Sequence, residues 1–190
     1  MKRISIYIVA LIIVACSLAL AAGKYKEGFN GFTWADPPEK IKAKYPKAKI
    51  LEGRGLYVEN EKLAGYPATL GFYFYKNQLS GAIVIFTMDE VRSEKYMDAF
   101  LRVESLLESK YGTDETKIRE NEASEYLSDI DSIAMGRGVY KDIWNTGESL
   151  IVLMVEAGSP IRIDLTLFYF CNELTAESHV EEDKKRAGEL

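Results

Sequence analysis

Residues 69–88, TLGFYFYKNQLSGAIVIFTM, contain two strand patterns joined by one turn. The first pattern alternates two sets of side chains, with Leu70, Phe72 and Phe74 on one face and Tyr73 and Tyr75 on the other. A polar segment at 76–78 follows, and the return segment 79–88 is apolar on both faces. The stretch therefore predicts a β-hairpin whose second strand is central in a sheet and covered on both sides.

Further strand patterns lie before and after this hairpin. A mixed run at 50–59 is interrupted by glycines, and a short apolar run occupies 139–145. The segments SLIVLMVE at 149–156 and IRIDLTLFYF at 161–170 flank a Gly- and Pro-containing turn. We interpret these last two segments as a second pair of adjacent strands.

Helical periodicity appears in two places. In residues 90–111 the apolar side chains recur at helical spacing, and Gly112 is a typical C-terminal stop. A shorter helix is predicted at 37–45, with Asp36 as its N-cap and Glu39 completing a capping box.

The order helix, strands, long helix, strands predicts an α+β fold. We expect an antiparallel sheet of about five to seven strands with helices packed on one face. Two degenerate helix-plus-meander repeats are a further expectation. One domain is predicted at 32–172, after a leader at 23–31 and before a charged tail at 173–190. The polar segment 114–138 is expected to hold one helix, near 123–135.

The chain opens with the three regions of a secretory signal peptide. Residues 1–3 (MKR) are positive, residues 4–18 are almost wholly apolar, and residues 19–21 (ALA) form a small-x-small cleavage site. The pattern predicts removal of residues 1–22 and a periplasmic or secreted protein. A retained anchor helix is one alternative. Lipidation is another, because IVAC at 13–16 resembles a lipobox and would make Cys16 the anchor of a membrane lipoprotein.

Charge limits the partners. Loss of Lys2 and Arg3 with the signal peptide takes the formal net charge from −5 to −7. Nucleic acid is therefore not expected as a partner, and membrane contact is expected only through the signal peptide or a lipid anchor at Cys16. The second cysteine, Cys171, is predicted to be a buried apolar residue.

The sequence favours a protein that is not an enzyme and needs no metal or cofactor. It has a single histidine, His179, in the charged tail, and no G-x-S-x-G, P-loop or dinucleotide motif. A hydrolase that uses two carboxylates stays open as an alternative, because 29 acidic residues offer many pairs. Among them is Asp164, which we expect to point to solvent from an alternating strand.

The aromatic residues supply the candidate binding surface. The chain has 12 tyrosines and 8 phenylalanines, and three predicted strands carry many of them on both faces. One face must be core, and the other is covered by a helix, a partner or an apolar ligand. We select Trp34, Tyr73, Tyr75 and Trp144 as binding residues, because Trp and Tyr are frequent hot spots. For Trp34, a place in the core beside the first helix is the alternative.

Several short motifs are similar to those of uncharacterised exported bacterial proteins that share an F-x-G-x-x-W motif. These motifs are Phe29-Asn30-Gly31-Phe32-Thr33-Trp34, the hairpin segment Tyr73–Leu79, and Lys110-Tyr111-Gly112. Ala35 stands where that family usually has glycine. The order of elements also resembles small envelope lipoproteins of β-barrel assembly and the β-lactamase inhibitor proteins. The resemblance implies an exported α+β protein and no assigned activity.

Together these features predict a non-enzymatic module of the cell envelope that binds another envelope protein. The alternatives are a periplasmic carrier of a small apolar or lipidic ligand and a carboxylate-based hydrolase.

Overall fold

The computed structural model describes residues 24–51, 55–88, 93–121, 128–159 and 162–188. The predicted signal peptide and Cys16 lie outside these residues. Two short strands, β1 (Gly28–Phe29) and β2 (Phe32–Thr33), form a small hairpin at the start.

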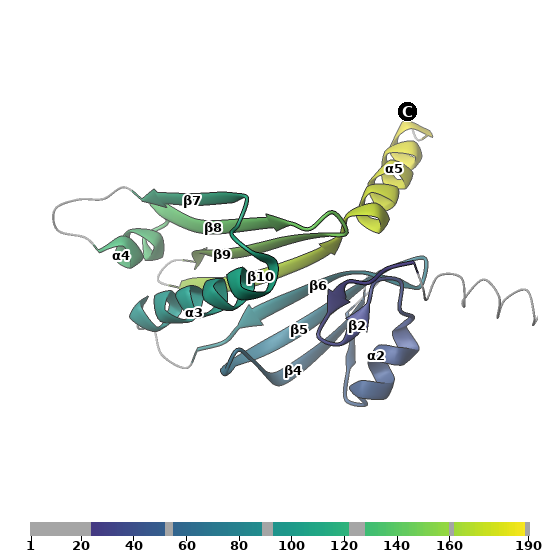
Figure 1. Ribbon diagram of the computed structural model, residues 1–190, viewed down its shortest axis with the longest axis horizontal. Coiled ribbons are helices and arrows are strands. Elements are labelled where there is room, and N and C mark those ends of the chain that lie inside the picture. Colours follow the sequence, from purple (N-terminus) through teal and green to yellow (C-terminus); the bar gives the residue numbers. More distant parts are fainter. Residues whose placement is uncertain (1–23, 52–54, 89–92, 122–127, 160–161, 189–190) are drawn as a thin grey trace, which may run out of the picture.

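The centre of the fold is one antiparallel sheet of eight strands (Figure 1). Its strands are β3 (Lys49–Leu51), β4 (Gly55–Leu63), β5 (Tyr66–Tyr75), β6 (Gln78–Phe86), β7 (Thr116–Asn121), β8 (Gly138–Asn145), β9 (Ser149–Ser159) and β10 (Arg162–Cys171). Their order in space is β3-β4-β5-β6-β10-β9-β8-β7. Two meanders of four strands therefore meet at β6 and β10.

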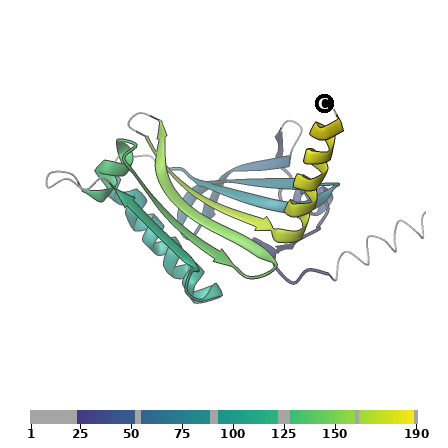
Figure 2. The same ribbon diagram turned by 90° about the horizontal axis from the view of Figure 1, so that it is seen from above.

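Four helices accompany this sheet in the described residues: α2 (Pro38–Lys44), α3 (Ser93–Tyr111), α4 (Asp129–Ala134) and α5 (Asn172–Gly188). The first three cover one face. Figure 2 shows α3 and α5 on opposite sides of the sheet. The α+β prediction is confirmed, whereas α5 departs from the expected single layer of helices. Each meander follows a helix, which is the predicted order for two repeats; their descent from one unit stays a prediction.

The core lies between the sheet and α2, α3 and α4. Its largest fully buried side chains come from both meanders, the helices and the N-terminal segment: Trp34, Ile41, Leu70, Phe72, Leu79, Phe100, Ile133, Trp144, Ile151, Leu153, Leu165 and Leu167. Cys171 is also buried and free, as predicted. Strands β5, β6, β9 and β10 contribute to this core because every second side chain of a strand points to the same face of the sheet, here the face covered by the helices.

The central hairpin has a turn of two residues. Lys76 and Asn77 both have positive φ angles, 50° and 62°. This is the conformation of a type I′ turn, whose twist matches that of the flanking strands. Gln78 belongs to β6, so the predicted turn at 76–78 is one residue too long.

Two further segments differ from the sequence prediction, whereas the charged tail, for which a frayed helix or a disordered end is expected, forms the helix α5. The sequence predicts a polar loop at residues 116–121, but they form the edge strand β7, because pairing with β8 outweighs their low strand propensity. Asp36 does not cap α2: the N-cap is Pro37, and the Asp36 carboxylate accepts from the Thr33 backbone N–H at 2.8 Å.

The predicted leader is part of the fold. Phe29 is only 4% exposed, and its ring centroid lies 5.1 Å from that of Tyr169 and 6.0 Å from that of Phe72. Nearby, Ser149 Oγ donates to Glu27 at 2.6 Å. The backbone N–H groups of residues 26 and 27 donate to the carboxylate of Glu148. The N-terminal segment is therefore fixed to the β8–β9 turn as well as to the core.

If this segment is structural, Phe29→Ala should destabilise the protein by about 3–5 kcal/mol, the cost of removing a buried aromatic ring. Urea unfolding followed by circular dichroism measures the change. The exposed Lys42→Ala is the matched control and should change stability by less than about 0.5 kcal/mol. Equal stability of the two variants would show that the segment is a dispensable leader.

Candidate functional site

The sheet face opposite α2, α3 and α4 carries a second set of apolar side chains. We call this surface the open face. Strand alternation places on it Ile143, Leu150, Val152, Met154, Ile83, Ile85, Phe168 and Phe170. All eight are half-buried, whereas their strand neighbours on the other face are mostly fully buried.

The register aligns these side chains in rows that run across the strands. In the middle row, Ile143 is opposite Val152, Val152 is opposite Phe168, and Phe168 is opposite Ile83. The adjoining row pairs Leu150 with Phe170. The Phe168 and Phe170 rings stack with centroids 5.9 Å apart. The result is a continuous apolar stripe over β8, β9, β10 and β6.

Two glycines, Gly71 and Gly81, leave room for side chains of the stripe to pack directly over the strand backbone. A Cβ atom at Gly71 would come within 2.5 Å of Ile83 Cγ2, and a Cβ atom at Gly81 would lie 3.1 Å from the Phe170 ring. The side chains of Ile83 and Phe170 thus lie over backbone that has no side chain of its own. They widen the smooth apolar surface toward β5.

Helix α5 borders one end of the open face. The Tyr75 hydroxyl donates to Glu181 at 2.6 Å, and Lys76 Nζ lies 2.9 Å from the same carboxylate. These two contacts, with Lys185, hold the pKa of Glu181 at about 2. Between α5 and the strands is an open pocket of about 580 Å³, lined by Leu150, Phe170, Asn172, Thr175, Ala176 and His179.

The four predicted binding residues do not form one surface. Tyr73 and Tyr75 lie on the open face and are half-buried. Trp34 and Trp144 are 1% and 2% exposed on the helix-covered side. Their indole N–H groups donate to Ser149 Oγ at 2.8 Å and to the Gly112 carbonyl at 3.1 Å.

Trp34 and Trp144 are core residues, because they are buried and their indole N–H groups are hydrogen-bonded within the protein. They are therefore not available to contact a partner. The stronger candidates are Phe168, Phe170 and the aliphatic residues of β6 and β9. The sequence does contain a signal for this second apolar surface. In residues 149–156 and 161–170 the side chains on both faces of the predicted strands are mostly apolar.

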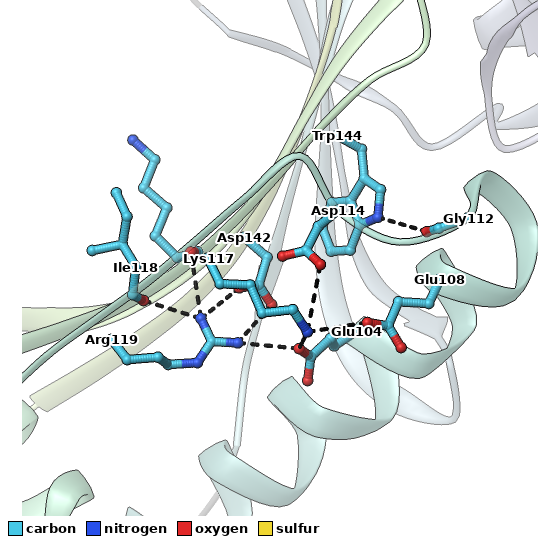
Figure 3. A network of polar contacts seen from close by, with 10 residues as sticks. Glu104, Glu108, Gly112, Asp114, Lys117, Ile118, Arg119, Asp142 and Trp144 are labelled. Carbon is cyan, nitrogen blue, oxygen red and sulfur yellow. Dashed lines mark hydrogen bonds and ion pairs between the residues drawn. The ribbon is translucent and has the colours of Figure 1, made fainter.

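A cluster of charged side chains lies on the helix-covered side of the sheet (Figure 3). Asp142 is fully buried and accepts two hydrogen bonds from Arg119, at 2.5 Å and 3.0 Å. Arg119 also donates to Glu104 at 3.1 Å, and Lys117 donates to Glu104 and Glu108 at 2.7 Å and 3.1 Å. These pairs join α3 to the edge strand β7 and to β8.

Aromatic rings complete the surroundings of Arg119. Its guanidinium carbon lies 5.1 Å from the centroid of Phe100 and 4.9 Å from that of Tyr140. The guanidinium thus lies against both rings and is held by carboxylates, which is a structural arrangement. No group of three or more potential metal ligands occurs within the part of the chain that the structure describes. The contacts of this cluster hold α3 to the sheet, so we assign the cluster to stability and consider the open face as the candidate site.

Comparison with known protein families, curated proteins and solved structures finds no match in any of the three. The resemblance to exported proteins with an F-x-G-x-x-W motif stays a prediction. Among the described residues, no helix combines the length and apolar character required to span a bilayer.

The buried cluster predicts a pH dependence of stability. Burial raises the pKa of Asp142 to about 6, and the Arg119 guanidinium opposes that rise. Since the folded-state pKa lies above the ordinary value, Asp142 favours the folded state most below about pH 4, and this contribution is lost as the pH rises through about 6.

The free energy of unfolding of the wild type should therefore decrease relative to that of Asp142→Asn between pH 4 and pH 7, in urea titrations of both proteins. A constant difference between the two proteins across this range would contradict the raised pKa. The exposed Asp98→Asn serves as the control and should follow the wild type.

Proposed function

We propose that this chain is an exported, non-enzymatic module that binds a protein partner on the open face of its sheet. The observation that carries the proposal is the apolar stripe through Val152, Phe168 and Ile83, which no element of the described structure covers. A monomer rarely leaves a contiguous apolar patch of this kind on its surface without a function.

The composition of the face supports a protein partner. It combines stacked phenylalanines with the half-exposed Tyr73 and Met154, and aromatic residues and methionine are enriched at protein interfaces. The surface is broad, and eight strands hold it in place. A preorganised surface of this kind loses little entropy when a partner docks.

Carriage of a small apolar ligand is a second candidate, and the pocket of about 580 Å³ beside Leu150 and Phe170 favours it. That volume lies within the usual range for small-molecule sites. The hydrolase alternative has no comparable feature in its favour among the described residues. The two remaining candidates predict different bound material, either protein over the stripe or lipid in the pocket.

The proposal predicts that Ile83→Glu combined with Met154→Glu lowers partner capture at least about 100-fold, because each buried carboxylate would have to be desolvated at the interface. In-cell crosslinking, affinity purification of the tagged protein and quantitative mass spectrometry measure capture.

Leu101→Glu is the matched control. Leu101 is half-exposed on α3, on the opposite side of the sheet, and this variant should capture as the wild type does. Circular dichroism establishes that all three proteins are folded. Equal capture by the double variant and the wild type would refute binding through the open face, and co-purification of lipid alone would favour the carrier.

A further inference from the structure

The N-terminal end of the described chain lies beside the first turn of α5. Lys24 Nζ forms an ion pair with the carboxylate of Glu173, which is in that turn, and the Tyr25 hydroxyl donates to the same carboxylate at 3.0 Å. Tyr25 is only 9% exposed, so this end of the chain is fixed to the domain. The residues that precede Lys24 therefore leave the domain at the start of α5.

The open face begins at the same place. Helix α5 lies on the side of the sheet away from α3 (Figure 2), and Phe170 of the open face is only three residues before Glu173. A pocket of about 460 Å³ between α5 and the β5–β6 turn is lined by Glu173 itself, by Tyr75 and by the exposed Val180. The pocket of about 580 Å³ described above borders the same helix. The chain that precedes Lys24 thus starts at the edge of this apolar surface.

Residues 4–22 form the longest apolar run of the chain and include no charged residue. Such a segment favours an apolar surface within its reach, because contact removes apolar area of both from water. Residues 19–23 span at most about 17 Å when extended, and a helix of residues 4–18 would be about 22 Å long. The face from β8 to β5 is about 19 Å wide, at about 4.8 Å between strands. The segment therefore has the reach and the length to lie across the stripe.

The tether gives this segment an advantage over a partner in solution. A segment that is joined to its site by a few residues is present there at an effective concentration in the millimolar range. This exceeds the concentration of a partner at micromolar level about a thousandfold. The advantage lasts only while residues 4–22 are attached, and the sequence predicts their removal.

From these observations we infer that residues 4–22, while attached, lie on the open face and keep it from its partner. Removal of residues 1–22 uncovers the stripe, so the chain binds only after processing. This inference rests on the proposed function and adds the step that switches it on. Until that step, the covering also protects the apolar stripe from association with other chains.

Photocrosslinking of the full chain tests the inference. Residues 1–190 are made in a membrane-free translation system, which leaves residues 1–22 in place, with p-benzoylphenylalanine replacing Val152 in the middle row. We expect crosslinks from position 152 to residues 4–22 of the same chain. The same group at Leu101, on the other side of the sheet, should give none. Mass spectrometry of mixed isotope-labelled and unlabelled chains separates crosslinks within one chain from those between two.

The outcomes keep this inference apart from the proposed function. Absence of crosslinks between position 152 and residues 4–22 would overturn the inference, and so would crosslinks to this segment of a second copy. Neither result concerns the processed chain, so partner binding through the open face would still stand. Capture with Ile83→Glu and Met154→Glu tests that function independently, on the protein after export.

Charged variants of the segment give a second readout. Ile8→Glu with Ile12→Glu in the full chain should reduce crosslinking at position 152 at least about tenfold, because carboxylates resist burial against an apolar surface. This variant should also bind more of the dye ANS than the wild type, with about threefold higher fluorescence, since the open face is then uncovered. A segment that is not docked predicts the reverse, because two carboxylates make a free segment less apolar.

Lys2→Glu with Arg3→Glu is the matched control. It also changes two residues at this end of the chain but leaves residues 4–22 intact, so crosslinking and dye fluorescence should match those of the wild type. Circular dichroism establishes that all these proteins are folded. Dye fluorescence of Ile8→Glu with Ile12→Glu that equals or falls below that of the wild type would contradict the covering of the open face.

Discussion

The pairing of β6 with β10 is the interaction on which the rest of the structure depends. These two strands join the meander of residues 49–86 to that of residues 116–171, with six residue pairs in register between Leu165–Phe86 and Phe170–Gly81. Without it, each half would be a four-stranded sheet with an unpaired apolar edge, which exposes hydrogen-bonding groups to association. With it, both apolar strands lie in the centre, and the edges are the short β3 and the charged β7.

The same pairing creates two apolar surfaces that differ in burial. Every second residue of β6 and β10 points to the helices, where Val84 and Leu167 are packed in the core. The intervening residues, Ile83 and Phe168 among them, face the other side, where in the described structure only α5 approaches, at one end. One constraint of strand geometry thus produces both the interior and the apolar open face, without any further structural element.

Local patterns predicted much of this fold. The structure confirms the strands β5, β9 and β10 and the helix α3 with its stop at Gly112. These elements could be predicted because the pattern of each depends on residues that are close together in the sequence. β7 could not be predicted, since Thr116–Asn121 becomes a strand only through pairing with β8. Local patterns place the N-terminal segment outside the domain because its anchors, Glu148 and Ser149, are more than 100 residues away in the sequence.

The candidate site was less predictable than the fold. The selection of Trp34 and Trp144 as binding residues depends on residue type alone, whereas their burial depends on tertiary packing.

The anchoring of the N-terminal segment has a consequence for the order of folding. Residues 25–34 are made before nearly all the rest of the domain, yet their partners Ser149 and Tyr169 are made among the last. Closing so long a loop costs entropy before any contact compensates for it. We therefore expect the first segment of the domain to be the last to dock, so that the unfinished chain keeps Phe29 and Trp34 exposed until β9 and β10 exist.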